Sequence, residues 1–208
     1  MKHKSGFVNI IGNPNVGKST LMNALIGQNL SIITNKAQTT RHRIKGILSD
    51  ENYQIVFSDT PGIIKPAYKL QESMMQYVKS AFQDADVILY VVEIGEQGLK
   101  DIEIFEKIKK LKIPLIILLN KIDLVTQEKV LIEMENWKNK FSDAVILPIS
   151  ALNGFNIKEI INSIVELLPF SPPYYSKEEV TDKSERFFVE EIIREKILKH
   201  YKKEVPYS

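Results

Sequence analysis

The chain has 208 residues, with 28 lysines and arginines, 26 aspartates and glutamates, and no cysteine. This length suits one ordinary domain with an appendage or two small domains, and the nearly balanced charge does not indicate a protein that mainly coats nucleic acid. The lack of cysteine excludes disulfides, thiolate metal sites and cysteine nucleophiles. No apolar run approaches the about 20 residues needed to span a bilayer, so we expect a soluble cytoplasmic protein.

Short apolar runs rich in β-forming residues alternate with longer amphipathic segments along the first 168 residues. Strands are predicted at Phe7–Ile11, Arg43–Leu48, Tyr53–Ser58, Val87–Val92, Leu115–Leu119 and Val145–Ile149. Helices are predicted at Lys18–Ile26, Leu70–Phe82, Lys100–Leu111, Gln127–Lys140 and Ile157–Leu168. This alternation favours an α/β fold, with a mostly parallel sheet and helices on both of its faces. The short connection between the second and third strands predicts a hairpin, which makes one edge strand antiparallel.

The composition changes near Pro169, where the proline-rich stretch PFSPPYYSKEE cannot continue a helix. From Asp182 to Lys203, apolar residues recur at helical spacing and predict one amphipathic helix whose apolar stripe needs a packing partner. We therefore predict a first domain over residues 1–168, a linker over 169–181, and the beginning of a second domain over 182–208.

Residues 12–20 read GNPNVGKST and match the P-loop pattern between a predicted strand and a predicted helix. Backbone N–H groups of such a loop, together with the helix N-terminus, converge on phosphate oxygens. Lys18 is expected to reach the β- and γ-phosphates, and the Ser19 hydroxyl to bind Mg²⁺. The alternative is a glycine-rich turn without a ligand. The residues assigned to nucleotide binding here are Gly12, Asn13, Pro14, Asn15, Val16, Gly17, Lys18, Ser19 and Thr20.

A second motif, Asp59-Thr60-Pro61-Gly62, directly follows the third predicted strand. We expect Asp59 to hold Mg²⁺ through water, opposite Ser19, and Gly62 to offer its backbone N–H to a γ-phosphate. Alone, this sequence could be an ordinary turn, because aspartate, proline and glycine all favour turns. Its position after the P-loop favours assigning all four residues to the nucleotide site.

The segment between Gly27 and Arg43 is expected to sense the γ-phosphate. Thr40 is predicted to complete the Mg²⁺ coordination, and the alternative is that Thr39 and Thr40 are solvent-exposed in a flexible segment. Catalytic roles are thus assigned to Lys18, Thr40 and Gly62. Four basic residues and no acidic one lie from Asn29 to Leu48, which indicates either a solvated loop or a surface facing phosphate or RNA. They are Lys36, Arg41, Arg43 and Lys45.

The motif Asn120-Lys121-Ile122-Asp123 ends a continuous apolar strand, where an open α/β sheet places its ligand crevice. Asp123 can accept hydrogen bonds from guanine N1–H and the N2 amine, which adenine lacks. Lys121 would lay its stem along the base, and Asn120 would tie loops together. Ser150 and Ala151 end the next strand, and we expect the Ala151 N–H to point toward guanine O6. These features predict GTP as the ligand, because unpaired buried polar groups reject a wrong base.

The motifs together resemble the Era family of bacterial small-subunit ribosome-assembly GTPases over essentially the whole chain. The matching stretches are GNPNVGKSTLMNALIGQ, KAQTTRHRIKGI, FSDTPGI, NKIDLV, PISALNG, EIIREKI and EVPYS. The first five also fit tRNA-modifying and double-domain ribosome-assembly GTPases, whereas AQTTRHRI and the tail favour the Era family.

This resemblance implies a Ras-like GTPase domain followed by a KH domain that binds RNA near the end of the small-subunit ribosomal RNA. The partners it implies are GTP and GDP, that RNA and the assembling subunit, with a monomeric state and a peripheral position at the inner membrane as further expectations. No glycine follows Gly154, so the GxxG loop with which KH domains hold RNA backbone is not in this sequence.

The resemblance also bears on hydrolysis. Ile63 stands where Ras-type enzymes have a glutamine that orients water. In related GTPases an asparagine matching Asn15 helps to bind K⁺, which implies slow hydrolysis that K⁺ stimulates. An asparagine that merely favours a turn is the alternative.

Two other functional classes stay open from the sequence. A nucleotide-gated RNA chaperone would share every motif, with hydrolysis incidental to binding. An ATP-dependent kinase or transporter ATPase would share the P-loop but would need an adenine pocket.

Overall fold

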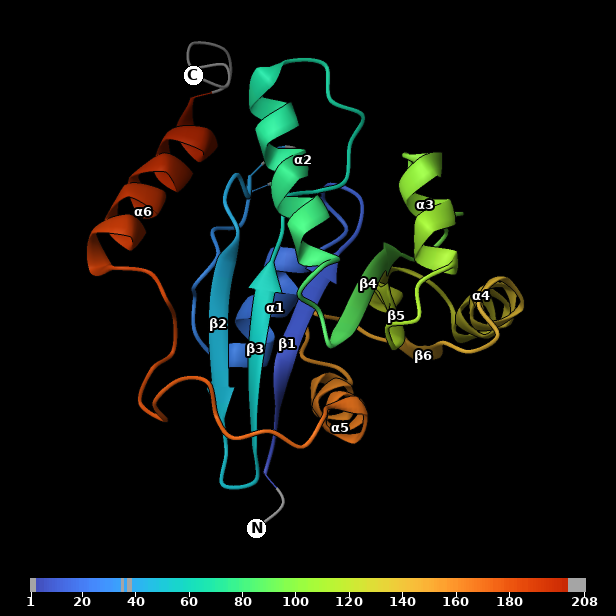
Figure 1. Cartoon of the computed structure of the whole chain (residues 1–208). Helices are drawn as coiled ribbons and strands as arrows, with labels where there is room; N and C mark the ends of the chain where they lie inside the picture. The colour runs from blue at the N-terminus through green and yellow to red at the C-terminus, as the bar shows by residue number, and fades with distance from the viewer. Residues whose placement is uncertain (1–2, 35, 37–38, 202–208) are drawn as a thin grey trace.

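The computed structural model describes residues 3–34, 36 and 39–201, which form a six-stranded sheet with helices packed on it (Figure 1). The strands are β1 (Lys4–Ile11), β2 (Ile44–Ser49), β3 (Tyr53–Asp59), β4 (Val87–Glu93), β5 (Leu115–Asn120) and β6 (Val145–Pro148). The helices are α1 (Lys18–Ile26), α2 (Lys69–Ala81), α3 (Ile102–Lys109), α4 (Gln127–Lys140), α5 (Ile157–Leu167) and α6 (Glu185–His200), with a 3-10 turn η1 (Ile122–Leu124). Ala37, Gln38 and the tail EVPYS, all parts of the family resemblance, lie outside the described residues.

The strand order is β2-β3-β1-β4-β5-β6, with β2 and β3 antiparallel and every other neighbouring pair parallel. This confirms the predicted sheet with one antiparallel edge. Because the other strands run in one direction, their carboxyl ends meet at one edge of the sheet. The antiparallel register also places Ile44, the first residue of β2, opposite Asp59, the last residue of β3. The loop before β2 therefore reaches the same edge.

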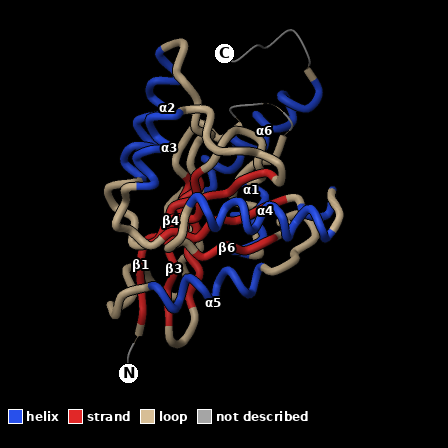
Figure 2. The backbone as a smooth tube through the Cα atoms, turned by 90° about the vertical axis from the view of Figure 1, so that its right-hand side faces the viewer, coloured by secondary structure: helices blue, strands red, loops and turns tan. Residues whose placement is uncertain are grey.

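Two apolar cores cover the two faces of the sheet, and Figure 2 shows the helices around the strands. One core includes α1 and α5, and the other includes α2, α3 and α4. Along β4 the odd-numbered residues from Val87 to Val91 belong to the first core, and the even-numbered ones from Ile88 to Val92 to the second. A strand buried on both faces explains why this segment reads as a continuous apolar run.

The predicted elements are all present, and the bounds of α1 and α4 are those predicted. The largest difference at a strand is in β1, which begins at Lys4 rather than Phe7 because Lys4, Ser5 and Gly6 pair with β3. That pairing depends on a distant segment, so the local apolar pattern does not contain it.

The segment between α5 and α6 follows the edge of the sheet. The Ile47 N–H donates to the Val180 carbonyl at 2.8 Å, and Thr181 Oγ1 donates to the Lys45 carbonyl at 2.7 Å. These contacts bring α6 back alongside the loop that precedes β2, near the top of that strand in Figure 1.

The apolar stripe predicted for α6 is buried only in part. Phe187 and Phe188 pack against the core of α1 and α5, whereas Ile192 and Ile193 are more than half exposed and Glu191 is buried. Packing of this part of the stripe on a partner stays a prediction, because Ile192 and Ile193 have no such cover within the described residues of this chain. None of the described helices is long and apolar enough to cross a bilayer.

Candidate nucleotide-binding site

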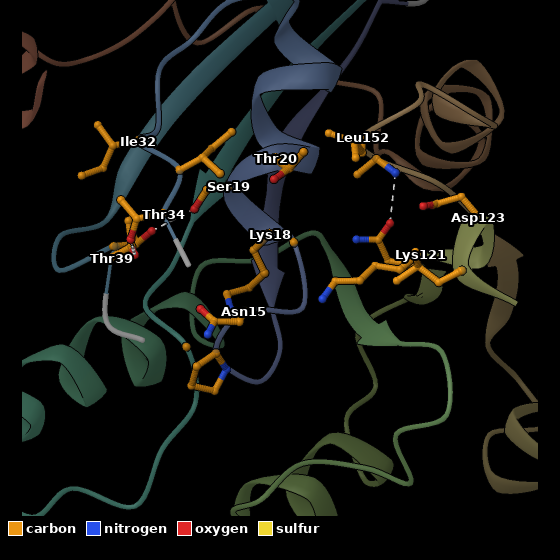
Figure 3. Close-up of a pocket in the computed structure, with 18 residues that line it drawn as sticks. Asn15, Lys18, Ser19, Thr20, Ile32, Thr34, Thr39, Lys121, Asp123 and Leu152 are labelled. Carbon is orange, nitrogen blue, oxygen red and sulfur yellow. Dashed lines mark hydrogen bonds between the residues drawn. The ribbon is translucent and has the colours of Figure 1, made fainter. Parts of the chain in front are cut away.

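A cavity of about 530 Å³ opens where the carboxyl ends of β1, β3 and β5 meet (Figure 3). The predicted motifs that lie far apart in sequence converge on it. Its walls are formed by Pro14, Asn15, Gly17, Lys18, Ser19, Thr20, Ile32, Ile33, Thr34, Thr39, Thr40, Gly62, Asn120, Lys121, Asp123, Leu124, Ala151 and Leu152.

The P-loop connects β1 to α1 through left-handed backbone at Asn15 and Gly17. A Cβ on Gly12 would collide with the Val91 carbonyl, and one on Gly17 with the Asn120 amide, so both positions require glycine. Gly17 is the N-cap residue of α1 and carries no side-chain cap. The first N–H groups of α1 therefore remain available at the cavity for an anion.

Lys18 is held inside the loop. Its Nζ donates to the Asn13 carbonyl at 2.7 Å and to the Gly12 carbonyl at 3.2 Å, and only 6% of the residue is exposed. Burial lowers the pKa of Lys18 to about 8, with Asp59 and Glu96 opposing the shift. A phosphate oxygen would give this ammonium a charged partner that the carbonyls do not provide.

Three oxygens meet beside Lys18. Ser19 Oγ donates to Asp59 Oδ2 at 2.7 Å and lies 2.9 Å from Thr40 Oγ1, which is 3.4 Å from the same carboxylate oxygen. Asp59 is fully buried, and its second oxygen, Oδ1, has no hydrogen-bond partner among the described residues. Burial raises the pKa of Asp59, while Lys18 and three hydroxyls act in the opposite direction. A hard cation fits this set, because hydroxyl and carboxylate oxygens are the ligands that Mg²⁺ prefers.

The DTPG segment is fixed against the P-loop. Thr60 Oγ1 donates to the Ile10 carbonyl at 2.7 Å, and the Ile63 N–H donates to the Gly12 carbonyl at 3.0 Å. A Cβ on Gly62 would approach Pro14 N and Cα to 2.8 Å, so the close contact needs glycine. Ile63 is fully buried in the core of α2 and α3 and does not line the cavity. Its side chain is therefore packed in the core and not available inside the cavity.

Asn120 joins the phosphate end of the cavity to the other end. Its Nδ2 donates to the Val16 carbonyl at 2.8 Å, and its Oδ1 accepts from the Ala151 N–H at 3.0 Å. Lys121 has left-handed backbone and extends its ammonium to Glu93 Oε2 at 2.6 Å, leaving the alkyl stem along the cavity. Asp123 lies in η1 and lines the same end.

The Ala151 N–H has an acceptor within the chain, and its expected contact with guanine O6 stays a prediction. This group donates to Asn120 Oδ1, because a buried N–H takes the nearest good acceptor. Ala151 also contributes to the wall of the cavity. Ser150 is buried outside the lining, where its Oγ accepts from the Asn153 N–H at 3.3 Å and shapes the turn.

Several residues assigned from the motifs support the cavity from behind its wall. Gly12, Asn13, Val16, Asp59, Thr60, Pro61 and Ser150 are not among the residues that line it. Asn13, for example, donates to the Gly98 carbonyl at 3.0 Å and accepts from the Lys100 N–H at 3.1 Å, tying the P-loop to the loop after β4.

The sequence motifs did not identify Ile32, Ile33, Thr34, Leu124 and Leu152 as lining residues. Leu124 and Leu152 each follow a motif residue and stay 68% and 79% exposed. Each of these leucines directly follows a residue assigned to base recognition, Asp123 or Ala151. That position could have indicated a lining role, because a purine has two apolar faces. The other three belong to the loop assigned to sensing, where no pattern singled them out.

The basic run from Asn29 to Leu48 is largely engaged within the chain. Arg43 forms an ion pair with Asp84 at 2.6 Å, and Lys45 Nζ lies 3.2 Å from the Tyr175 hydroxyl. Lys36 Nζ donates to the Tyr201 carbonyl at 2.7 Å. These three side chains therefore have partners within the chain, and a surface that faces phosphate or RNA stays a prediction.

Comparison with known proteins gives a consistent result. The profile of the family described as "50S ribosome-binding GTPase" matches residues 7–121. The GTPase Era of Clostridium kluyveri is 47% identical over 206 residues, covering 99% of this chain and 70% of its own, and that of Staphylococcus haemolyticus is 44% identical over 208 residues, covering 100% and 70%.

Solved structures agree. A crystal structure of Era in complex with MgGDPNP and nucleotides 1506–1542 of 16S ribosomal RNA superposes with a TM-score of 0.94 at 40% identity, covering 99% of this chain and 70% of that one. An Aquifex aeolicus Era variant bound to GDP.AlF4⁻ gives a TM-score of 0.93 at 40% identity with the same coverage. The site described above is consistent with these relatives, because it contains a P-loop, the oxygens of Ser19, Thr40 and Asp59, and an NKID motif. The chain therefore belongs to the Era family of GTPases, enzymes that bind GTP and hydrolyse it.

Proposed function

We propose that this chain is a Mg²⁺-dependent GTP hydrolase that acts as a switch in assembly of the small ribosomal subunit. The observation that carries the proposal is the meeting of Ser19, Thr40 and Asp59 beside Lys18, in a cavity whose far end holds Asp123. One nucleoside triphosphate would bind with its phosphates beside Lys18 and its base beside Asp123.

Lys18 and the first N–H groups of α1 would bind the β- and γ-phosphates, because they offer positive charge in a buried place. Ser19 and Thr40 would hold Mg²⁺ directly, and Asp59 would hold it through water. Bound Mg²⁺ supplies positive charge next to the phosphates. Thr40 and Gly62 would sense the γ-phosphate, Thr40 through the metal and Gly62 through its backbone N–H, so loss of that phosphate would release both loops.

Asp123 would select guanine by accepting from N1–H and the N2 amine. The stem of Lys121, aligned by Glu93, and the exposed Leu124 and Leu152 would cover the two faces of the base. Ala151 would limit the space at the edge of the base, because it lines the cavity while its N–H donates to Asn120 Oδ1.

Ile63 is aliphatic and buried in the core, so it cannot orient the water that attacks GTP. Hydrolysis in this protein therefore needs another group near the phosphates. Asn15 lines the cavity with left-handed backbone and is the candidate for a K⁺ site near the phosphates. We expect phosphate release from GTP to be faster in KCl than in NaCl, and Asn15→Ala to remove that difference. Equal rates in both salts for the unaltered protein would contradict the K⁺ role.

The proposed partner is the small-subunit ribosomal RNA, because the relative that superposes at a TM-score of 0.94 is in complex with 16S ribosomal RNA. On this proposal residues 1–168 are the GTPase domain, 169–181 the linker and 182–208 the beginning of an RNA-binding domain. We propose a cytoplasmic monomer, and cell fractionation would test whether it also associates with the inner membrane.

Phosphate release from GTP measured with and without Mg²⁺ tests the hydrolase, with Lys18→Ala as the inactive control. Co-sedimentation with assembling small subunits tests the switch: we expect association to differ between GDP and a non-hydrolysable GTP analogue. Association that is the same with both nucleotides would contradict the switch, and association that persists unchanged in a hydrolysis-dead variant would favour the nucleotide-gated RNA chaperone with incidental hydrolysis.

A further inference from the structure

Beyond Phe187 and Phe188, α6 contacts the domain through polar side chains. Arg194 Nη2 donates to the Thr39 carbonyl at 2.6 Å, and Glu195 Oε1 accepts from the Ile33 N–H at 3.2 Å. Both partners are backbone groups of the loop between α1 and β2, beside which α6 lies in Figure 1. Two residues of one helix therefore hold that loop on either side of its centre.

Arg194 is itself held in place. Arg194 Nε donates to Glu191 Oε1 at 2.8 Å, and a second nitrogen bonds the other oxygen of the same carboxylate. Glu191 is 7% exposed, and a carboxylate is rarely buried to this extent without a charged partner. Burial lowers the pKa of Arg41, and Arg194 adds to this effect while Glu191 opposes it, so a third charge lies close to the pair.

A second arginine pair on the same helix shows the contrast. The side chains of Arg186 and Glu190 are 88% and 62% exposed, and they form an ordinary i,i+4 pair. Such pairs contribute little, because water screens them. The Arg194–Glu191 side chains are 19% and 9% exposed, and the arginine has a further bond to the loop.

The loop held by α6 is a wall of the nucleotide cavity. Ile33, Thr34, Thr39 and Thr40 all line it, and the Thr40 hydroxyl lies within 3.4 Å of both Ser19 Oγ and Asp59 Oδ2. The backbone group bound by Arg194 belongs to the residue directly before Thr40. A displacement of the Thr39 carbonyl would therefore move the Thr40 hydroxyl relative to the other two oxygens.

We propose that Arg194 and Glu195 are positioning residues for Thr40, which makes α6 part of the machinery that recognises a triphosphate with its metal. This role rests on the metal-binding function proposed above for Thr40. It adds that a helix more than 150 residues away in sequence preorganises this ligand. Preorganisation of this kind reduces the ordering that the loop must undergo when the nucleotide binds.

Affinities for GDP and for a non-hydrolysable GTP analogue, both with Mg²⁺, test the proposal in Arg194→Ala against the matched control Arg186→Ala. We expect Arg194→Ala to weaken binding of the analogue about tenfold, which is equivalent to about 1.4 kcal/mol, and to change the affinity for GDP by less than about twofold. The Mg²⁺ concentration needed for half-maximal analogue binding should rise in parallel. Arg194→Lys keeps the charge but lacks the planar fork that binds Glu191 and the Thr39 carbonyl together, so it should recover only part of the loss. Arg186→Ala should bind both nucleotides like the unaltered protein.

Equal weakening of GDP and the analogue by Arg194→Ala, or no change in either, would overturn the proposal. Failure of the underlying metal role of Thr40 has a different signature, because Thr40→Ala would then leave the Mg²⁺ concentration needed for half-maximal analogue binding unchanged. Thermal unfolding of each variant detects a loss of folding. If Arg194→Ala does not fold, Arg194→Lys takes its place: an analogue-to-GDP preference below that of the unaltered protein supports positioning, and an unchanged preference refutes it.

Discussion

Removal of the Asn120 side chain should lower both the stability of the protein and its affinity for guanine nucleotides. Asn120 is 2% exposed, and it satisfies two buried backbone groups at once, the Val16 carbonyl at 2.8 Å and the Ala151 N–H at 3.0 Å. Asn120→Ala leaves both without a partner. A buried polar group left unsatisfied costs about 1–3 kcal/mol, so for two such groups we expect the free energy of unfolding to fall by about 2–6 kcal/mol.

The same change should weaken guanine nucleotide binding at least tenfold, because the P-loop and the base-binding loop lose the link between them. Urea denaturation of the unliganded protein measures the first effect, and nucleotide titration at a temperature where the variant is folded measures the second. The control is Asn153→Ala, an exposed asparagine in the neighbouring loop, which should change stability by less than about 0.5 kcal/mol. A loss in Asn120→Ala no larger than in this control would refute the assigned linking role.

Asp123→Asn should weaken GTP binding and shift the base preference toward xanthine nucleotides, because the amide can donate where the carboxylate accepts. Competition binding with both nucleotides measures this preference, and retained GTP selectivity would argue against the assignment. Glu93→Ala should weaken nucleotide binding about threefold to tenfold, because the Lys121 ammonium loses its partner at 2.6 Å. The control is Glu106→Ala, a change at an exposed glutamate. Identical nucleotide affinities of the two variants would exclude the role of Glu93 in aligning Lys121. Because burial holds the pKa of Lys18 at about 8, below its ordinary value, part of this lysine is neutral at about pH 8.5 and must gain a proton when a phosphate binds. Calorimetry of GDP binding in buffers of different ionisation enthalpy should thus show proton uptake at that pH, and an absence of uptake would mean that Lys18 is already charged.

The layout of the sheet and the main motifs were predictable because each rests on a local pattern. The apolar runs of β4 and β5 are buried on both faces, and the glycines of the P-loop occupy positions where a Cβ would collide. The short connection after β2 fixed the antiparallel pair, which in turn brings Thr40 to Asp59.

What could not be predicted depends on contacts between distant segments. Asn120 accepts from the Ala151 N–H across 31 residues, and this gives a partner within the chain to a group that the motif alone assigns to the base. Arg194 and the Thr39 carbonyl are 155 residues apart, and the helical spacing around Arg194 favoured an apolar contact instead. Hydrogen-bond partners at that separation leave no periodic signal in a single sequence.

We expect one cavity to bind a guanine nucleotide through Lys18, the oxygens of Ser19, Thr40 and Asp59, and Asp123. Titration calorimetry with GDP and with ADP, each in the presence of Mg²⁺, tests it most directly. We expect saturable binding of GDP and an affinity for ADP that is weaker by on the order of 10³-fold or more, because Asp123 would face an adenine edge, which lacks the two donors of guanine. Folded protein that gives no binding heat with GDP, or that binds ADP equally well, would contradict it.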